Sequence, residues 1–432
     1  MKQLIYPHLG LFLYHLNDGV KEEDQLIPVP KELYNGYPID GLRYSSSLGD
    51  TNSLLALYSV NEGDNNQPQD ISCLAELKNK ILKDRVVEEK LKIAADRKVG
   101  KSWMILGVIP SFWDSLTADS LALEAAKSLS IGEFTETVKS EKFMGATVYE
   151  FWQAPSQWQD VEAENSHIVI ILYHDKTALD SFNQFKVDWM KLFLYRHKIL
   201  WAYRNSQNQD IKQFLRQHLL PADTTFTGIQ VSSEASAVLE SGLIQRKNML
   251  QKSYVIVSQY AKYITFLEVQ LQTLETNLYN YQERRNSLLK KAEKFGGTTD
   301  ADLLKAFTQI PAKKCQMQIT RDIAALSPGL KAQEIFINTL RGSADIEQVE
   351  SDRNIENLIA AAGIGVGTAS AAAGAGSALV KDFTQFYPIK VDKSQYPFAE
   401  PLSNLFIVLL FSLGSGWVIG WWSFNRLRSR TK

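Results

Sequence analysis

Residues 401–424, PLSNLFIVLLFSLGSGWVIGWWSF, form an apolar stretch with no charged side chain over 24 positions. A helix rises about 1.5 Å per residue, so this length matches the roughly 30 Å hydrocarbon core of a bilayer. Trp417, Trp421 and Trp422 lie toward one end, where indole rings favour the headgroup region. A basic tail, residues 425–432, follows directly, and such clusters stay on the cytosolic side. We therefore predict a transmembrane helix over 401–424.

A second uncharged stretch, residues 357–380, is dominated by alanine, glycine and serine. Small residues let membrane helices approach closely, and Gly363 with Gly367 gives one such helix-packing pair. A flexible Ala/Gly linker is the alternative. We favour a first transmembrane helix, because a cytosolic N-terminus and a basic cytosolic tail require an even number of crossings. Residues 381–400 would then form a short external loop.

The N-terminal residues indicate that the bulk of the chain stays in the cytosol. Pro7 and His8 interrupt the first apolar run, so it does not match a secretory signal peptide. Two distant cysteines, Cys73 and Cys315, suit a reducing compartment. We therefore expect a multi-pass protein of the plasma membrane (the inner membrane of a bacterium), in contact with lipid and with both termini in the cytosol.

Residues 1–222 alternate apolar, β-rich runs with helical patterns, which is typical of an α/β or α+β layer domain. Helical patterns lie near 71–96, 118–130 and 177–204. The predicted strands are Leu11–Leu16, Leu54–Val60, Trp103–Pro110, Ala146–Trp152 and His167–Tyr173.

Residues 223–356 are predicted to form a helical stalk, with one long helix over about 231–295. Apolar residues there recur at alternating intervals of three and four, which is the seam of a coiled coil. The helix cannot bury this seam alone, so it needs a partner helix from its own chain or from a neighbour. The seam residues are Val257, Tyr260, Ile264, Leu267, Leu271, Leu274, Leu278 and Tyr281, with Leu288 beyond a break at Arg285.

A returning helical region is predicted over 301–356, with breaks at Pro311 and Pro328. Gly342 to Asp345 would then begin a last helix that continues into the first membrane span. Such a stalk suits a gate, and it also suits a passive spacer. The predicted fold class is thus an α/β N-terminal cytosolic domain plus long coiled-coil-like stalk helices and two C-terminal transmembrane helices.

This order of parts resembles the CorA-type divalent-cation channels, over the whole chain in architecture. Tyr396-Pro397-Phe398-Ala399 is similar to the aromatic–proline start of the second span in that family, and Asn354 and Asn357 lie where the family often places a pore-lining asparagine. The sequence departs from the family where its Gly-Met-Asn signature should close the first span. Residues 379–383 read Leu-Val-Lys-Asp-Phe instead, which puts magnesium selectivity in doubt.

The resemblance implies a homo-oligomer, a pentamer if it is CorA-like, with a divalent cation such as magnesium as the transported or regulatory ion and no other cofactor. One face of the first span could line a narrow polar pore, because polar groups there should face protein or water. Thr368 could instead bond to its own helix. The pore-lining candidates are Asn354, Asn357, Ala361, Gly365, Thr368 and Ala372.

The sequence gives no indication of an enzyme. Gly100-Lys101-Ser102 lacks the glycine that a phosphate-binding loop requires, since Ala95 occupies that position, and we interpret it as a solvated turn. His174-Asp175 follows a strand, but no GxSxG elbow occurs, so a surface loop is favoured. Net charge is −1 and charges of both signs alternate, so we expect no nucleic-acid partner.

Three functions follow from this organisation. The first is a homo-oligomeric cation channel or transporter, gated by its cytosolic domain through the stalk. The second is a membrane-embedded signalling or defence effector, whose cytosolic domain senses a regulatory ligand or protein and triggers permeabilisation. The third is a non-conducting membrane anchor that presents a coiled coil.

Overall fold

The computed structural model divides the protein into two compact units, which we call unit 1 and unit 2. Unit 1 comprises Met1–Gln213 with Ile264–Leu326, and unit 2 comprises Phe214–Tyr263 with Ser327–Lys432. The described residues are 2–17, 19–60, 67–109, 115–136, 138–155, 166–219, 236–309 and 311–347. Both predicted membrane spans and the loop between them lie outside these ranges. Among the described helices, none is long and apolar enough to cross a membrane.

Unit 1 contains a mixed β-sheet whose strands follow the order β2-β3-β4-β1-β6-β9-β8-β7, with β5 pairing β1. Strands β6 and β9 are parallel, and the other neighbours pair in antiparallel fashion. All five predicted strands are present, within β1, β4, β6, β8 and β9. The strands are β1 Gln3–Leu16, β2 Gln25–Tyr34, β3 Tyr37–Leu48, β4 Thr51–Val60, β5 Gln69–Asp70, β6 Lys98–Val108, β7 Glu141–Phe143, β8 Ala146–Gln153 and β9 Ser166–Tyr173.

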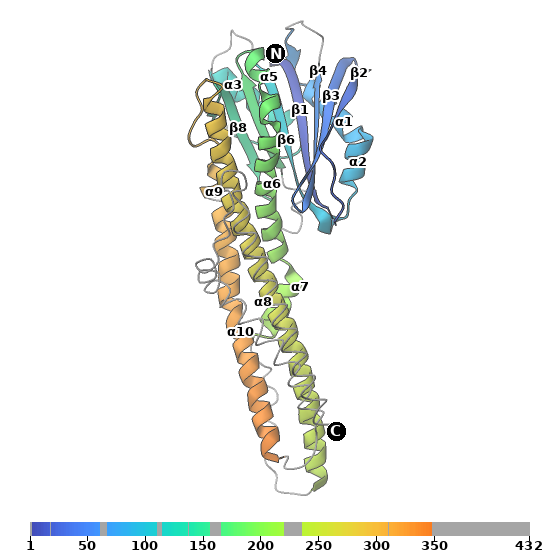
Figure 1. The fold of residues 1–432 in the computed structure, drawn as a ribbon, viewed down its shortest axis with the longest axis vertical. Coiled ribbons are helices and arrows are strands. Elements are labelled where there is room, and N and C mark those ends of the chain that lie inside the picture. Colours follow the sequence, from blue (N-terminus) through green and yellow to red (C-terminus); the bar gives the residue numbers. More distant parts are fainter. Residues whose placement is uncertain are drawn as a thin grey trace, which may run out of the picture. The chain divides into compact units, whose positions relative to one another are not determined.

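Helices lie on both faces of this sheet (Figure 1). The helical regions predicted near 71–96, 118–130 and 177–204 are occupied by α1 to α6. The α-helices are α1 Cys73–Lys83, α2 Arg85–Leu91, α3 Ser115–Ser128, α5 Lys176–Asp180, α6 Phe182–Ser206, α7 Gln209–Gln217, α8 Ser236–Glu293, α9 Ala306–Gln309 and α10 Pro311–Glu347, and a short 3-10 turn spans Ala95–Arg97.

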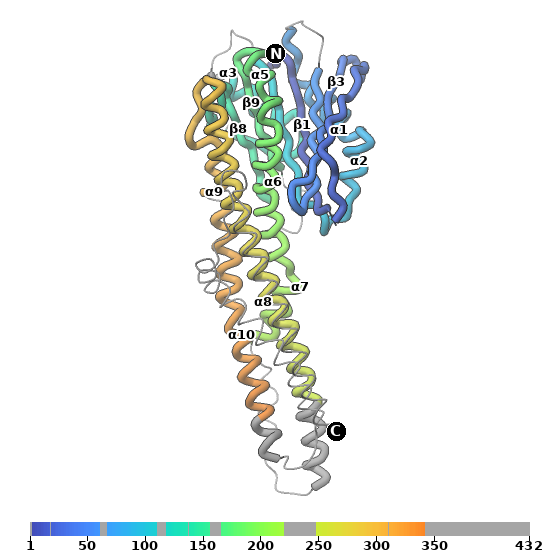
Figure 2. The backbone as a smooth tube through the Cα atoms, viewed as in Figure 1, coloured from blue at the N-terminus to red at the C-terminus, as the bar shows by residue number. Residues whose placement is uncertain are grey.

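Alternate residues of β1 enter two separate cores. Leu9, Leu11 and Leu13 pack with buried residues of α1, α2 and α3, and we call this the first face of the sheet. Phe12 and Tyr14 pack with α6, α8 and the residues between α8 and α10, on the second face. Successive side chains of a strand point to opposite sides, so one strand serves both cores and unit 1 is a three-layer arrangement (Figure 2).

The two edge strands of the sheet differ in how far their outer edges are covered. Strand β2 is exposed along most of its length and contains Pro28 and Pro30. Residues 298–300 lie along the edge of β7 that no strand pairs with among the described residues. There Asp300 N–H donates to the Lys142 carbonyl at 2.9 Å, and Lys142 N–H donates to the Asp300 carboxylate at 2.7 Å.

Helices α8 and α10 pack against each other in unit 2. Leu250 and Val257 of α8 share an apolar cluster with Ile337 and Leu340 of α10. A Cβ placed on Gly329 of α10 would run into the Tyr260 side chain of α8, so glycine there permits close approach. Unit 1 contains one further contact, in which Gln316 of α10 donates to Glu275 of α8 at 2.9 Å. Residue numbers rise along one helix as they fall along the other, so the pairing within each unit is antiparallel.

Of the two breaks predicted in the returning region, the one at Pro311 coincides with the start of α10, and the one at Pro328 is wrong. Helix α10 begins at Pro311, where a proline is tolerated because the first helical N–H has no partner, and it continues through Pro328. Gly342 to Asp345 also lie inside α10 and do not begin a new helix. An interior proline costs about 3 kcal/mol, and the packing of α10 on α8 offsets this cost.

Residues 301–309, which we call the connector, join the ends of α8 and α10 and are fixed by polar contacts in unit 1. Arg285 of α8, which breaks the apolar seam, donates to the carbonyls of Ala301 and Leu303. The Tyr281 hydroxyl donates to the Leu304 carbonyl at 3.0 Å. Leu304 N–H donates to the Glu141 carboxylate at 2.7 Å. Arg285 thus interrupts the apolar seam because its guanidinium binds the backbone of the connector.

Candidate functional site

The predicted site residues fall into two groups. The pore-lining candidates Asn354, Asn357, Ala361, Gly365, Thr368 and Ala372, and the packing pair Gly363 and Gly367, lie outside the described residues. The seam residues lie on α8. Val257, Tyr260, Ile264, Leu267, Leu274 and Tyr281 are buried, as is Leu288, whereas Leu271 and Leu278 are partly exposed. Within each unit, buried seam residues share a core with residues of the same chain.

A chain of polar side chains lies on the second face of the sheet, buried except for Glu150, whose side chain is 17% exposed. Ser102 of β6 is at its centre, with its hydroxyl 2.6 Å from Nδ1 of His167 on β9. The same hydroxyl is 2.7 Å from Nε2 of His197 on α6. At the other side of His167, Nε2 lies 3.2 Å from Oε1 of Glu150 on β8. We call His197, Ser102, His167 and Glu150 the polar chain.

Arg196 of α6 lies beside the polar chain. One of its terminal nitrogens is 3.9 Å from Glu150 Oε1, an ion-pair separation that is too long for a hydrogen bond. Its guanidinium lies 4.1 Å from the ring centre of Phe307 in α9 and 4.9 Å from that of Trp152 in β8. Its nitrogens have no hydrogen-bond acceptor among the described residues. Arg196 is thus held by a carboxylate and an aromatic face from β8 and by a second aromatic face from α9.

Burial dominates the electrostatics of this cluster. Ser102 and His197 are 0% exposed, and His167 and Arg196 are 1% exposed. Burial lowers the pKa of both imidazoles well below the ordinary value, and the Arg196 cation lowers each further. Burial raises the pKa of Glu150, and Arg196 opposes this rise. The folded state therefore favours uncharged imidazoles next to a buried cation.

The order of hydrogens along the polar chain follows from the donor inventory. A serine hydroxyl has one hydrogen, so Ser102 donates to one imidazole and accepts from the other. With Glu150 ionised, His167 must donate from Nε2, which leaves its Nδ1 to accept from Ser102. His197 then donates to Ser102 from Nε2, and its Nδ1 is a bare acceptor, in agreement with the lack of any partner at that atom.

A serine, a histidine and a carboxylate in a row are also the parts of a nucleophilic triad. Here the serine lies next to Nδ1 of His167 and the carboxylate next to Nε2, which is the reverse of the usual triad. A nucleophile also needs space for a substrate next to its oxygen, and Ser102 has no exposed surface. The arrangement can orient hydrogens and resist or accept a proton, but it offers no approach for a substrate.

The interpretation of Gly100-Lys101-Ser102 as a solvated turn is wrong, because these residues lie within β6. A Cβ at Gly100 would run into the His197 ring, so glycine lets α6 approach the strand closely. His174 and Asp175 are exposed, and Asp175 caps α5 by accepting from Ala178 N–H at 2.7 Å.

The polar chain was missed because its members are far apart in the sequence. The one local signal is Arg196-His197-Lys198, three basic residues within residues 192–202 of α6, which are otherwise apolar or aromatic. All three are buried. Basic residues in the middle of an apolar helical pattern indicate buried polar partners, because a buried charge without a partner is costly. Their partners could be identified only from the fold.

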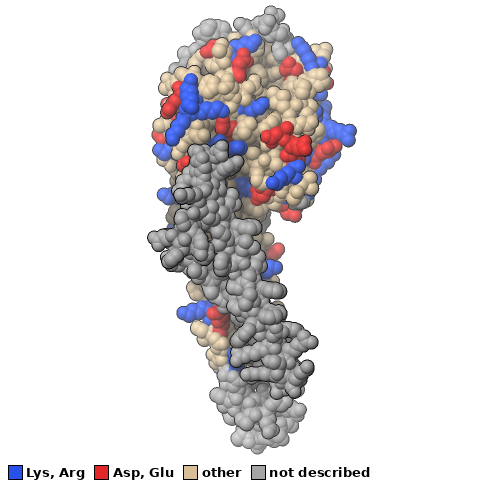
Figure 3. Space-filling model, in the orientation of Figure 1, with Lys and Arg blue, Asp and Glu red and all other residues tan. Residues whose placement is uncertain are grey.

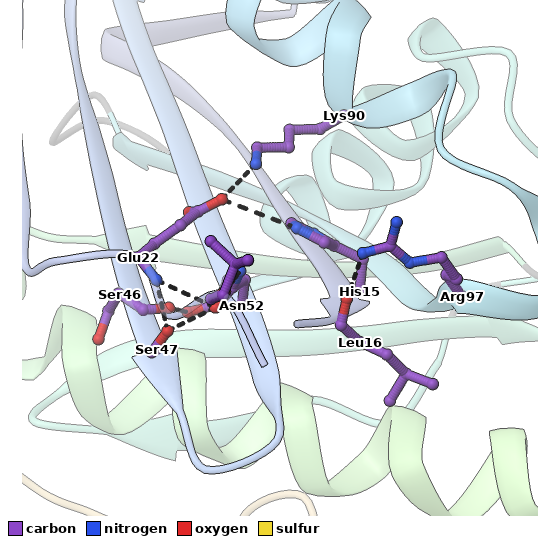
Figure 4. Close-up of polar contacts among 10 residues, drawn as sticks. His15, Leu16, Glu22, Ser46, Ser47, Asn52, Lys90 and Arg97 are labelled. Carbon is purple, nitrogen blue, oxygen red and sulfur yellow. Dashed lines mark hydrogen bonds and ion pairs between the residues drawn. The ribbon is translucent and has the colours of Figure 1, made fainter. Parts of the chain in front are cut away.

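A second polar cluster lies at one end of the sheet (Figure 4). Glu22, just before β2, accepts from Lys90 of α2 and lies 3.7 Å from His15 Nε2. Glu22 N–H donates to the Ser47 hydroxyl at 2.8 Å, and the Asn52 side-chain amide donates to the Val20 carbonyl at 2.9 Å. The Glu22 side chain is 21% exposed. This cluster attaches the segment before β2 to the strand ends.

Surface charge and metal-ligand geometry add no further site. Acidic and basic side chains lie next to each other on the described surface drawn in Figure 3. Across the described ranges, no three His, Cys, Asp or Glu side chains are grouped so that they could hold a metal ion.

No protein-family model, curated protein or solved structure matches this chain.

Proposed function

We propose that the protein is a homo-oligomeric membrane channel or transporter for cations, regulated by unit 1 through helices α8 and α10. The observation that carries this proposal is the continuity of α10. It runs from Pro311, next to the connector, to Glu347. The uncharged stretch at 357–380 begins ten residues later in the sequence. A continuous helix of this kind would convert a movement of the connector into a displacement of the first span.

The antiparallel pairing of α8 with α10 supports the same proposal. A single helix of 37 residues bends easily, whereas a helix that buries apolar residues against a neighbour resists bending. Pro328 would weaken α10 locally, yet the helix passes through it without interruption. The pairing of α8 with α10 within each unit thus supports a role in passing a movement toward the membrane spans.

Cation selectivity is proposed from the stripe of Asn354, Asn357, Ala361, Gly365, Thr368 and Ala372. A ring of amide and hydroxyl oxygens, with the carbonyls of small residues, can replace part of a cation's hydration shell. Several copies around one axis would bring these groups together. The absence of the Gly-Met-Asn signature means that the proposal specifies a cation and leaves the choice of ion open.

Cysteine labelling tests the membrane topology. Both natural cysteines are buried, so background labelling should be low. In intact cells, a membrane-impermeant maleimide should label Ser394→Cys in the predicted external loop. It should label Thr431→Cys in the tail only after permeabilisation. If Ser394→Cys reacts only after permeabilisation, the two-span topology is wrong.

Ion flux tests conduction. The purified full chain should sediment as an oligomer in detergent and release a cation-sensitive dye signal in liposomes. Asn357→Leu and Thr368→Leu should each lower the flux at least about tenfold, because leucine removes a polar lining group. Ser370→Leu is the matched control, because at 100° per residue it lies about 200° from Thr368 on a helix. Equal flux in all three variants, or a monomeric protein, would exclude this pore.

The missing signature also favours a second candidate, a membrane-permeabilising effector. A housekeeping channel would conduct a narrow set of ions in the resting protein. An effector would be closed until stimulated and would then pass ions of both signs and small dyes. Liposomes that contain a small anionic dye distinguish the two once the protein has been stimulated, because only the opened effector releases the dye.

A further inference from the structure

The polar chain links two parts of unit 1 that also meet through apolar contacts and through hydrogen bonds such as the one from Arg204 of α6 to the Lys98 carbonyl of β6 at 3.1 Å. On one side are β6, β8 and β9 of the sheet, which carry Ser102, Glu150 and His167. On the other side is α6, which carries His197 and, one residue earlier, Arg196. Arg196 in turn lies between Trp152 of the sheet and Phe307 of the connector. Arg196 therefore adds a contact to the hydrogen bonds that Glu141, Tyr281 and Arg285 make with the connector. The charge state of the polar chain acts on Arg196 through Glu150.

An additional proton on this chain would either break a hydrogen bond or add a positive charge in a confined, buried place. The Ser102 hydroxyl already donates once and accepts once. The remaining lone pair, on His197 Nδ1, faces the backbone at Gly100, where space is so limited that a Cβ would overlap the ring. A second cation would also lie within the field of Arg196 and Lys101.

The alternative acceptor is Glu150. Protonation there would neutralise the carboxylate that faces Arg196 and would leave the cation buried without a counter-charge, which is costly. Each route for proton uptake thus weakens the contacts that hold Arg196 in place, unless the imidazoles become exposed to water.

We propose that the polar chain is an acid-opened latch, which holds the connector on the sheet through Arg196 while both imidazoles are neutral. Opening would expose His167 and His197 to water, where an imidazole binds a proton near pH 6.5. Because the open form binds these protons and the closed form resists them, acidification shifts the equilibrium toward opening.

The groups around the polar chain fix the direction of this response. The lowered pKa values of the two imidazoles favour opening in acid. The raised pKa of Glu150 acts in the opposite direction, so the histidines must dominate for the latch to open. The other titratable or charged groups facing the cluster are Tyr14 of β1, Lys101 of β6, Glu141 of β7, Arg196 of α6, Tyr281 and Arg285 of α8, and Cys315 of α10.

The latch rests on unit 1 alone, and only its effect on the membrane spans depends on the proposed function. Hydrogen exchange measured by mass spectrometry on the full chain in detergent tests it without any ion flux. A negative flux experiment therefore leaves the latch standing, and a negative exchange experiment leaves the channel proposal standing.

Connector amides should exchange at least about fivefold faster at about pH 5.5 than at about pH 7.5, after correction for the intrinsic pH dependence of exchange. Amides of α1, on the first face of the sheet, should change less than about twofold. This comparison uses the wild-type protein, so it does not depend on whether a variant folds. Equal changes in the connector and in α1, or no change in either, would overturn the latch.

Variants identify the titrating groups. His167→Gln and His197→Gln should each remove at least about half of the acid response, because an amide keeps a hydrogen-bonding group but does not titrate in this range. His174→Gln, an exposed histidine, should keep the full response. A full response in both imidazole variants, or its loss in His174→Gln, would contradict the assignment.

Discussion

The two faces of the sheet in unit 1 are buried in different ways. On the first face, β1 and its neighbours meet α1, α2 and α3 through a cluster made of apolar side chains. On the second face the apolar cluster surrounds two histidines, an arginine and a serine that have almost no exposed surface.

This difference separates two sources of stability. Apolar burial contributes about 25 cal/mol per Å², does not depend on direction and is insensitive to protons. A buried polar group stabilises only if its partners are in place and in the right charge state. The second face thus depends on conditions, and it is the face on which α6 and the connector pack.

The largest effect is expected for Arg196→Ala on the second face. It should lower the free energy of unfolding by about 3–5 kcal/mol, because Glu150, whose side chain is only 17% exposed, would lose its counter-charge and the rings of Trp152 and Phe307 would lose the guanidinium packed on them. Thermal unfolding of the full chain in detergent, followed by circular dichroism, measures this loss. The pair Arg196→Met with Glu150→Gln should recover part of it, since both charges are then absent. A loss below about 1 kcal/mol would show that the ion pair is unimportant.

A slightly smaller effect is expected on the first face. Leu121 of α3 is fully buried in the apolar cluster. Leu121→Ala should lower the free energy of unfolding by about 2–4 kcal/mol, from lost burial and the cavity that remains. The loss should be the same at about pH 7.5 and about pH 5.5, because no titrating group is involved. A loss that changes with pH would contradict the claim that the stability contributed by the first face is independent of pH.

The stability of the wild-type chain should depend on pH because of the second face. His167 and His197 have lowered pKa values when folded, so stability is lost as pH falls below their unfolded value of about 6.5. Each imidazole contributes at most about 1.4 kcal/mol per pH unit. Glu150 opposes them, because its raised pKa makes its contribution decline as pH rises. We expect a net loss of about 1–2 kcal/mol per unit below pH 6.5, and the double variant His167→Gln with His197→Gln should lack it.

A side chain added between β6 and α6 tests how closely the second face is packed. Gly100→Ala should cost about 1–3 kcal/mol, because the methyl group would displace the His197 ring. Gly49→Ala is not a matched control, since Gly49 has a positive φ of 71°. Gly10→Ala suits better, because its Cβ would meet flexible leucine side chains of β4 at 3.3 Å and 3.5 Å. A larger cost at Gly10 than at Gly100 would contradict this packing argument.

The smallest effect is expected at the polar cluster that lies at the end of the sheet. Lys90→Met removes an ion pair whose side chains are 24% and 21% exposed. Such pairs contribute about 0–1 kcal/mol in water and are screened by salt. The change should be within this range and should shrink in about 0.5 M salt. A loss of stability comparable to that of Arg196→Ala would show that the difference in exposure does not set how much each polar cluster contributes to stability.

The sequence predicted the central strands well, because β1, β4, β6, β8 and β9 are rich in β-branched and aromatic residues. It missed β2 and β3. Strand β2 contains two prolines and few buried residues, and β3 contains three consecutive serines and an internal glycine. Strand β3 is held by pairing with β4, and β2 by pairing with β3, which local residue preferences do not report.

The prediction failed for the polar chain and for α10 for the same reason. Ser102, His167 and His197 come together only when β6, β9 and α6 pack, so no spacing in the sequence could identify them. The sequence predicts a helix break at Pro328, yet α10 continues through it because its apolar residues pack against those of α8. Tertiary contacts decided both cases, and local rules could not include them.

The edges of the sheet limit how copies of this chain could assemble. Pro28 and Pro30 remove hydrogen-bond donors from the outer side of β2, since a proline in an edge strand turns its missing N–H toward solvent. At the opposite margin, residues 298–300 already occupy the backbone groups of β7. Neither margin can readily recruit a strand from a second molecule. An assembly of several subunits would therefore have to form through side chains, and its geometry would be set by helix surfaces rather than by a shared, continuous sheet.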